Sequence, residues 1–491
     1  MDGARAASTI KTVHNLTSAT TARITGASNM AKSAPPCKKA ETLLATVKGR
    51  SFSIGLPSQQ RGCTSPPTPK NGSLLLTRCS TKPGVDSDNV TSKNPPITLD
   101  PNSTAQQSSA PAQRRALSSM SCRGLVLDLG PECSWDGSEI GSPVVKRYIG
   151  DDEERWYMWY YGRLSRENAS DSIGLAVSGN GICWARGAGP ARSSSDVGMV
   201  MNCSVNWWGF DTESIRPSEM VIMSSNMYSS VYWLYYTGCT AEEVKLPELP
   251  KLPIENPERA HSDAKKSEHH EIGKVLKSLP GLACSQDGRN WARIEGDHHN
   301  GALLDVGSGK EWDSLFIAAP RVVMHCGDDI RMYYHSYDLE SKQFAIGMAR
   351  SRDGIRWVKL GKILGGRGNG YFDELGVMNA HVVRDQKYGK YLMAYEGVAA
   401  DGMRSIGMAI SEDGLKNWVR IQDDPVLWPS GNYGWDNRGV GSPYLVHMEG
   451  SADEWRLYYR GLGQEGRTGI GMAVSNGSAV RRFHRWEGFH L

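Results

Sequence analysis

A unit of about 60 residues occurs five times in the second part of this 491-residue sequence, and such repetition constrains the fold more than any single motif. One element of the unit is an apolar string of the type Ile-Gly-Met-Ala, shortened to Gly-Leu-Ala in the second copy. The five copies begin at Ile173, Gly281, Ile346, Ile406 and Ile470. A run rich in aromatic residues precedes each copy. These runs are Trp156–Tyr161, Val231–Tyr236, Ile330–Tyr334, Tyr391–Tyr395 and Trp455–Tyr459.

Each unit opens with an aromatic residue followed by an aspartate. The five aspartates are Asp136, Asp211, Asp313, Asp373 and Asp436. Six or seven residues later stands a Pro, or Ala380 in the fourth unit, and a short apolar run follows. The aspartates are 75, 102, 60 and 63 residues apart, and the longest interval holds an insertion at 240–280 that is rich in Lys, Glu and Pro. We expect this charged insertion to be a surface loop.

Each unit is expected to contain four short strands: the apolar run, the aromatic run, the Ile-Gly-Met-Ala string and the segment around a later Trp. Asp-Gly pairs follow the third strand at Asp287, Asp353 and Asp413, and such pairs are a strong hairpin signal. Four strands in series form a sheet that buries both faces only against neighbouring sheets. The sequence therefore predicts an all-β fold, a five-bladed β-propeller over residues 121–491. A stacked β-solenoid is the alternative, but the coils of a solenoid are not joined by hairpin turns of this kind.

The N-terminal 120 residues have a different composition. All 15 Trp and 19 Tyr lie after residue 120, so this segment cannot bury enough apolar surface to offset the entropy of ordering. We expect residues 1–120 to be a disordered extension. It is rich in Ser, Thr, Ala and basic residues, and its first 85 residues contain only Asp2 and Glu41 as acids, which is typical of a transit peptide and indicates a plastid (chloroplast) location. A disordered regulatory tail is the alternative.

Charge and cysteine content narrow the function classes. Residues 121–491 hold 41 Lys and Arg against 48 Asp and Glu, which argues against a nucleic-acid partner. The sequence has no run of 18 apolar residues, so it predicts no membrane span. The ten cysteines form no Cys-x-x-Cys pair and no His spacing suggests zinc, so we expect neither a metal nor a cofactor.

Two motifs within the repeats resemble a known superfamily. They are a Ser-x-Asp-Gly-x-x-Trp hairpin, at Ser285–Trp291 and Ser351–Trp357, and a Tyr-x-Gly end to the second strand, at Tyr395–Gly397 and Tyr459–Gly461. Both are similar to motifs of the arabinanase/levansucrase/invertase superfamily, the five-bladed sugar-active propellers that include glycoside hydrolase families 43 and 32. The resemblance covers the predicted propeller. It implies a glycosidase site in a funnel on the central axis, where the innermost strands begin and carboxylates act as acid, base or nucleophile.

In that superfamily the acids usually stand immediately before, or two residues before, the Pro of the inner strand. The residues immediately before the Pro-equivalent here are Ser142, Arg216, Ala319, Asn379 and Ser442. The residues two before it are Gly141, Ile215, Ala318, Met378 and Gly441. None of them is acidic, so the superfamily's catalytic residues cannot be assigned position by position, and whether the protein is an enzyme stays open.

Other carboxylates lie close to these positions. Glu139 and Glu213 each stand four residues before a Pro, and Glu374 follows the aspartate of the fourth unit. We expect Glu139 or Glu213 to act as general acid, with the other or Glu374 as base, because glycosidic cleavage needs two carboxyl groups. The alternative is that all three are carboxylates of surface loops. The repeated aspartates are expected to cap loops by accepting backbone amide bonds.

Further polar side chains are expected at the same mouth as a substrate-binding set. They are Arg216, Arg321, Asn379, His381, Arg438 and Tyr444. Arg and Asn suit sugar hydroxyl, carboxylate and phosphate groups. Trp207, Trp208 and Tyr371 are candidate aromatic platforms. Two hypotheses follow: a glycoside hydrolase of the plastid, or an inactive propeller that binds a glycan, a small anion or a protein that the sequence does not identify.

Overall fold

The computed structural model describes residues 122–149, 153–166, 169–187, 196–225, 228–244, 275–385, 387–448 and 453–488. The extension predicted over residues 1–120 and the centre of the 240–280 insertion lie outside these ranges. The two ends of that insertion belong to strands, because β8 ends at Val244 and β9 begins at Val275. No helix in the described ranges is long and apolar enough to span a membrane.

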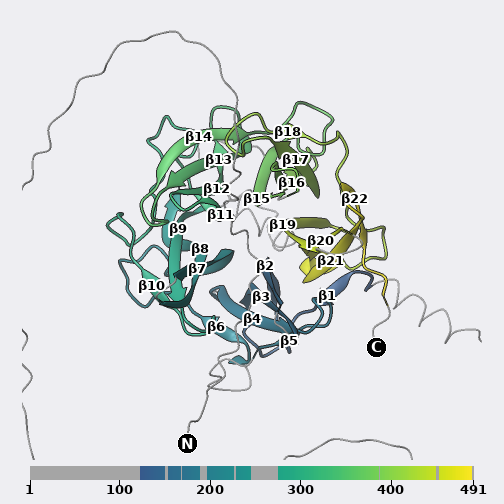
Figure 1. Cartoon of the computed structure of the whole chain (residues 1–491), viewed down its shortest axis with the longest axis horizontal. Helices are drawn as coiled ribbons and strands as arrows, with labels where there is room; N and C mark the ends of the chain where they lie inside the picture. Colours follow the sequence, from purple (N-terminus) through teal and green to yellow (C-terminus); the bar gives the residue numbers. More distant parts are fainter. Residues whose placement is uncertain are drawn as a thin grey trace, which may run out of the picture. The chain divides into compact units, whose positions relative to one another are not determined.

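The described strands form five blades of antiparallel strands around a central axis, which confirms the predicted five-bladed propeller (Figure 1). Short parallel pairs join blades 3, 4 and 5 into one continuous sheet. Blade 1 contains β2 (Glu139–Ile149), β3 (Glu154–Arg163), β4 (Ser172–Ser178), β5 (Ala185–Arg186) and β6 (Met199–Met201). Blade 2 contains β7 (Ser214–Ser225), β8 (Tyr228–Val244), β9 (Val275–Ser285) and β10 (Ala292–Ile294). Blade 3 contains β11 (Ala318–Cys326), β12 (Asp329–Asp338), β13 (Gln343–Ser351) and β14 (Val358–Leu364).

Blade 4 contains β15 (Gly376–Arg384), β16 (Tyr391–Val398), β17 (Arg404–Ser411) and β18 (Val419–Arg420). Blade 5 contains β19 (Gly439–Met448), β20 (Glu454–Leu462), β21 (Thr468–Asn476) and β22 (Ala479–Arg485), with a 3₁₀ turn at Gln464–Gly466. The strands β2, β7, β11, β15 and β19 surround the axis (Figure 1). The five predicted aromatic runs lie in the second strands of the blades.

The ring closes through the first described strand. β1 (Leu125–Leu127) pairs with β21 of blade 5, beside the segment of β21 that pairs with β22. The indole of Trp435 also donates to the carbonyl oxygen of Arg123 at 2.9 Å. The two ends of the repeat region are therefore hydrogen-bonded within one blade, so that strand pairing holds the ring shut.

The glycine of the Ile-Gly-Met-Ala string is required by an aromatic ring that lies on it. In each blade the aromatic residue before the repeated aspartate packs on a Tyr of the second strand, with ring centroids 5.3 to 6.1 Å apart. A Cβ atom on the glycine beneath would meet one of these two rings at 2.1 to 2.5 Å. These glycines are Gly174, Gly281, Gly347, Gly407 and Gly471. The repeated string therefore exists because only glycine leaves room for the ring.

The repeated aspartate binds two side chains in every blade. One is the hydroxyl of the Tyr just described, at 2.9 to 3.3 Å; the pairs are Tyr160–Asp136, Tyr236–Asp211, Tyr334–Asp313, Tyr395–Asp373 and Tyr459–Asp436. The other is a basic side chain of the outermost strand, at 2.7 to 2.8 Å; these are Arg186, Arg293, Lys359, Arg420 and Arg485. The predicted structural role is confirmed, but side-chain donors from two strands fill it in place of the backbone amides we expected.

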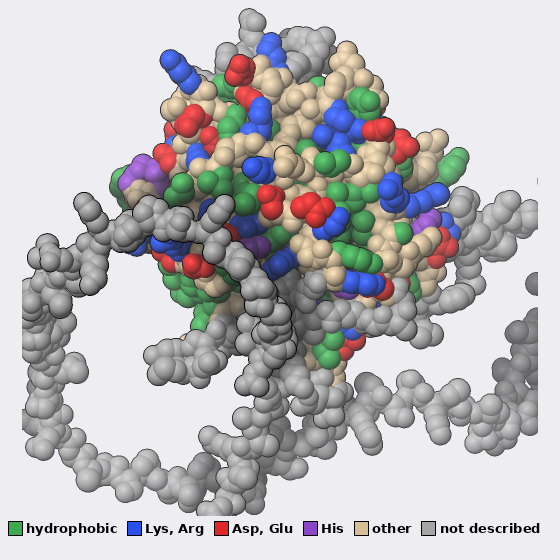
Figure 2. Space-filling model, turned by 45° about the horizontal axis from the view of Figure 1, so that its top comes forward, with side chains coloured by type: hydrophobic (Ala, Val, Ile, Leu, Met, Phe, Trp, Pro, Cys, Tyr) green, Lys and Arg blue, Asp and Glu red, His purple; other side chains and the backbone are tan. Residues whose placement is uncertain are grey.

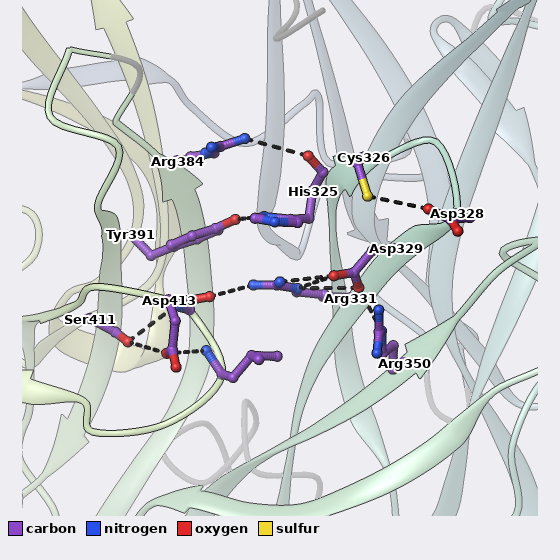
Figure 3. A network of polar contacts seen from close by, with 12 residues as sticks. His325, Cys326, Asp328, Asp329, Arg331, Arg350, Arg384, Tyr391, Ser411 and Asp413 are labelled. Carbon is purple, nitrogen blue, oxygen red and sulfur yellow. Dashed lines mark hydrogen bonds and ion pairs between the residues drawn. The ribbon is translucent and has the colours of Figure 1, made fainter. Parts of the chain in front are cut away.

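A second set of bonds joins neighbouring blades. Trp159, Tyr235, Tyr333 and Tyr458 donate to the carbonyl oxygens of Gly288, Gly354, Gly414 and Gly181, respectively, at 2.6 to 3.1 Å. Each acceptor is the glycine of the outer hairpin turn in the next blade, and the last pair links blade 5 to blade 1. Figure 3 shows the same border between blades 3 and 4, where Arg331 donates to the carbonyl oxygen of Asp413 and His325 is hydrogen-bonded to Tyr391.

We expect Gly347→Ala to lower the free energy of unfolding by about 1–3 kcal/mol or more, because its Cβ would lie 2.1 Å from the indole of Trp312. Gly309→Ala is the matched control, since a Cβ at Gly309 meets no atom within 4 Å. Urea unfolding followed by fluorescence measures both. Equal stability of the two variants would contradict the packing described above.

Candidate functional site

The inner strands share a bulge close to where they begin. In four blades the bulged residue has a positive φ: Ser142 (47°), Ala319 (50°), Asn379 (48°) and Ser442 (46°). The pairing with the second strand shifts at the same point. Bulges re-aim the side chains that follow them and are frequent beside active sites.

The strand register corrects the alignment of blade 2. Arg216 pairs with Thr237 just as Gly141 pairs with Tyr161, so Pro217 corresponds to Ser142 and not to Pro143. The sequence holds the signal for this shift, because Pro217 follows its aspartate by six residues whereas the other units have seven. Counting eight residues from each aspartate identifies one equivalent position in every inner strand. Its occupants are Val144, Glu219, Arg321, His381 and Tyr444.

Glu219, the blade 2 member of this set, contacts two of the other four members and was not among the predicted residues. Its carboxylate accepts bonds from Lys146 Nζ at 2.9 Å and from the hydroxyl of Tyr444 at 2.7 Å, and it lies 3.5 Å from Nε2 of His381. Burial would raise the pKa of Glu219, but Lys146 and His381 outweigh it and hold the pKa well below its ordinary value. Glu219 is therefore an ionised group that joins blades 1, 2, 4 and 5.

Glu139 lies in a second charged cluster where blades 5, 1 and 2 meet. It accepts bonds from the hydroxyl of Tyr161 at 2.7 Å and from Arg460 at 2.9 Å, and Arg163 lies 3.6 Å away. Burial alone would raise its pKa, but Arg460, Arg163 and Arg216 together lower it. The carboxylate is therefore ionised near neutral pH, which suits a base better than a general acid.

Asp171 extends the Glu139 cluster towards blade 2. Its carboxylate is within 2.7 Å of Nε of both Arg163 and Arg216, and it accepts a bond from the hydroxyl of Ser214 at 2.6 Å. The backbones of Asp171 and Ser214 form a parallel bridge between the two blades. Corresponding bridges join Phe344 to Gly376 and Arg404 to Gly439. The charged cluster thus lies on a point where adjacent blades are hydrogen-bonded.

Glu396 forms a third centre between blades 4 and 5. It accepts bonds from Nδ2 of Asn379 at 2.9 Å, from Arg404 at 3.0 Å and from the backbone N–H of Ser442 at 2.9 Å. It is the middle residue of a Tyr-x-Gly motif and was not predicted as a site residue. The equivalent positions all follow the repeated Tyr and carry different chemistry. They are Tyr161, Thr237, His335, Glu396 and Arg460.

Three of these five residues accept the backbone N–H of the bulged residue in the next blade. The pairs are Thr237 with Ala319 (2.8 Å), His335 with Asn379 (3.2 Å) and Glu396 with Ser442 (2.9 Å). In blade 2 the bulged residue is Pro217, which has no N–H to donate. The hydroxyl of Tyr161 instead donates to Glu139.

The predicted site residues divide into two groups. Six of them are buried and lie on the inner strands, and with the clusters around Glu219, Glu139 and Glu396 they form what we call the axial layer. They are Glu139, Arg216, Arg321, Asn379, His381 and Tyr444. Glu213 and Arg438 are exposed, and Glu374 lies in a loop where it accepts the N–H of Gly370 at 2.8 Å. Glu213 and Glu374 take no part in the bonds of the layer described above, so their catalytic role remains a prediction. Among the platform candidates, Trp207 is 90% exposed, and Trp208 and Tyr371 are exposed as well.

The layer contains two neutral histidines. Nδ1 of His335 accepts the N–H of Asn379, and Nδ1 of His381 accepts the N–H of Leu445 at 3.0 Å, so each proton lies on Nε2. Burial lowers the pKa of His335 to about 3 and that of His381 to about 4. Within the part of the chain that the structure describes, no group of three or more His, Cys, Asp or Glu side chains is arranged to hold a metal ion.

Stability is expected to fall as the pH drops below about 6.5, where an unfolded histidine takes up its proton. His335 and His381 resist protonation in the folded state, so the unfolded state gains the protons first. The free energy of unfolding should then fall by about 1.4 kcal/mol per pH unit for each residue until the folded pKa is reached. Urea unfolding at pH 7, 6 and 5 measures this slope. His335→Gln should make the slope shallower, and an unchanged slope would disprove the assignment.

No protein-family model matches the sequence, and no curated protein matches it. Solved structures with a similar fold include one described as "Glycoside hydrolase" (17% identity, TM-score 0.48), for which the match covers 77% of this chain and 99% of that protein. A second is a putative glycoside hydrolase from Bacteroides ovatus (16%, TM-score 0.45; 73% and 95% covered). A third is described as belonging to the GH130 family of mannoside phosphorylases, which "contains glycoside hydrolases" (13%, TM-score 0.45; 72% and 89% covered). The chain is thus similar in fold, at low identity, to proteins described as glycoside hydrolases.

Proposed function

We propose that this propeller binds an acidic saccharide, one that carries a carboxylate or phosphate group, at the axial layer. The observation that carries the proposal is an excess of basic over acidic side chains in this layer. Among the described residues, all five blades contribute a basic side chain, six in all, against the four carboxylates of Glu139, Asp171, Glu219 and Glu396. The contributing side chains are Lys146, Arg163, Arg216, Arg321, Arg404 and Arg460. Among the described residues, carboxylates enter the layer from blades 1, 2 and 4. The composition of residues 1–120 supports a plastid location for this activity.

The arginines of the layer are held in fixed orientations. Arg216 bonds to Asp171, Arg404 to Glu396 and Arg460 to Glu139, each at 3.0 Å or less. A guanidinium group that is already oriented loses little side-chain entropy when it binds an anion. It also offers paired donors that match the geometry of a carboxylate or phosphate. The layer is therefore preorganised for an anionic group of the ligand.

Exposed aromatic side chains on the loops that lead into the inner strands support a saccharide ligand. Trp207 lies between β6 and β7, and Trp428 and Tyr433 lie between β18 and β19. Their exposed fractions are 90%, 50% and 79%. Aromatic rings pack well against the apolar faces of sugar rings. On the face that Figure 2 displays, basic and acidic side chains are interspersed.

Arg460→Gln should weaken binding of galacturonic acid oligosaccharides at least tenfold, because a hydrogen bond to a charged group contributes about 1.5–3 kcal/mol. Arg438→Gln is the matched control, since Arg438 is exposed and directly precedes the inner strand β19. Isothermal titration with the full chain measures both, and neutral galacto-oligosaccharides serve as the uncharged comparison. Equal affinity of the two variants, or stronger binding of the neutral sugar, would contradict the proposal.

Hydrolysis of a glycosidic bond is the second candidate function. The observation that favours it is the 2.7 Å bond from the Tyr161 hydroxyl to the ionised carboxylate of Glu139. A nucleophile within hydrogen-bond reach of a base is the arrangement that activates a hydroxyl group. A neutral phenol also avoids the repulsion that a carboxylate nucleophile would meet from an anionic sugar. In this scheme Glu139 takes the proton of Tyr161 as the phenolic oxygen attacks the anomeric carbon, and the glycosidic bond breaks as the leaving group departs with its electron pair. Water then hydrolyses the tyrosyl glycoside, which returns the proton to Tyr161 and frees the sugar.

An aryl glycoside of galacturonic acid tests this second function, because its leaving group departs without a protein acid. Glu139→Gln and Tyr161→Phe should each lower kcat by at least a hundredfold, while Glu213→Gln should lower it only if Glu213 is the second catalytic carboxylate that the sequence predicts. Release of the phenol, followed by absorbance, measures all four proteins. Equal turnover in the four proteins would reject the catalytic role of Tyr161 and Glu139. The proposal that the layer binds acidic oligosaccharides would be unaffected, because the Arg460 variant tests it separately.

A further inference from the structure

Three of the buried polar atoms that form no hydrogen bond within the described part of the chain lie on β12 of blade 3 and β15 of blade 4. They are Nε2 of His335, the hydroxyl of Tyr337 and Oδ1 of Asn379. Each of these side chains is 1% exposed. His335 and Tyr337 are two residues apart on β12, so they share one face of the strand. Buried polar groups without partners are rare in folded proteins, and each indicates a missing partner.

The hydrogen-bonding character of these atoms is fixed by their neighbours. Because Nδ1 of His335 accepts the N–H of Asn379, its Nε2 carries the proton and is a donor. Asn379 donates its Nδ2 to Glu396, which leaves Oδ1 as an acceptor. The Tyr337 hydroxyl can donate or accept. One donor and one acceptor therefore lie on two hydrogen-bonded residues of neighbouring blades, and a group of either kind lies two residues along β12 from the donor.

Apolar side chains border these polar groups. Phe316 is fully buried and packs edge-on to the imidazole of His335, with ring centroids 6.0 Å apart. Phe316, Tyr337 and Met378 belong to one buried apolar cluster. The combination of neutral donors and acceptors with an apolar border differs from the charged clusters around Glu139 and Glu219. This combination suits a neutral ligand group that donates and accepts hydrogen bonds at the same time and that lies next to the apolar C–H surface of the ligand.

We propose that His335, Tyr337 and Asn379 form a subsite that binds ring hydroxyl groups of the saccharide. A hydroxyl accepts the Nε2 proton of His335 and donates to Oδ1 of Asn379, which satisfies both atoms with one group. This inference rests on the proposed function, since it adds the neutral part of the same ligand. The saccharide would place its anionic group against the arginines and its hydroxyl groups between blades 3 and 4. These three residues then determine which sugar stereochemistry is accepted.

Tyr337→Phe is the most direct test, because it removes a hydroxyl that has no protein partner in the described chain. Its thermal stability should equal that of the unaltered protein, while its affinity for galacturonic acid oligosaccharides should fall about five- to tenfold. Tyr334→Phe is the matched control, since it removes the bond to Asp313 and should lower stability without changing affinity. His335→Gln keeps an acceptor and a donor and should retain more affinity than His335→Leu.

Deoxy analogues of methyl galacturonate identify the hydroxyl group involved. One deoxy analogue should bind the unaltered protein about tenfold more weakly than the parent sugar does. To Tyr337→Phe, or to the His335 variants, the same analogue should bind at least as tightly as the parent sugar. If all analogues lose affinity equally in every variant, the subsite is wrong and the acidic-saccharide proposal stands. If neutral methyl galactoside shows the same sensitivity to Tyr337, the subsite stands and the requirement for an anion fails. If no sugar binds, both proposals are overturned.

Discussion

The buried bond between an aspartate, a tyrosine and a basic residue is the contact on which each blade depends. It ties the loop before the inner strand to the second and outermost strands, as in Asp211 with Tyr236 and Arg293. A charged carboxylate that is buried needs such partners, because an unpaired one is costly. One residue type thus fixes three elements at once, and the aromatic ring beside it accounts for the glycine in the third strand. The residues that recur in the sequence repeat are those that make this contact.

The same framework sets where the functional layer lies. Bonds between hairpin turns and the next blade, such as Tyr458 to Gly181, hold the blades at one height around the axis. Side chains that are distant in sequence, such as Glu139 and Arg460, then meet within 2.9 Å. The chemistry of the layer therefore depends on the closed ring. A change that loosens the border between two blades would separate charged partners as well as apolar ones.

The fold could be predicted from the sequence because its signals are local: a string, a turn and an aromatic run at a fixed phase. Part of the layer could be predicted too, since Arg216 lies beside Pro217, and Asn379 and His381 flank Ala380, which stands at the Pro position of the fourth unit. Glu219 could not be found while the units were aligned on proline, because Pro217 is displaced by one residue in blade 2. Glu396 could not be found because burial of a second-strand carboxylate depends on Arg404 and Asn379 of other strands, which only the folded chain brings together.

The position eight residues after each aspartate carries a different residue in every blade. Its occupants range from Val144 to Glu219, yet the bonds that build the blades do not pass through it, because they belong to the aspartate, the tyrosine and the basic residue. Substitution there changes one fifth of the inner wall and leaves the scaffold of that blade in place. Where the occupants contact one another, as Glu219 contacts His381 and Tyr444, a change of ligand would require these residues to change together.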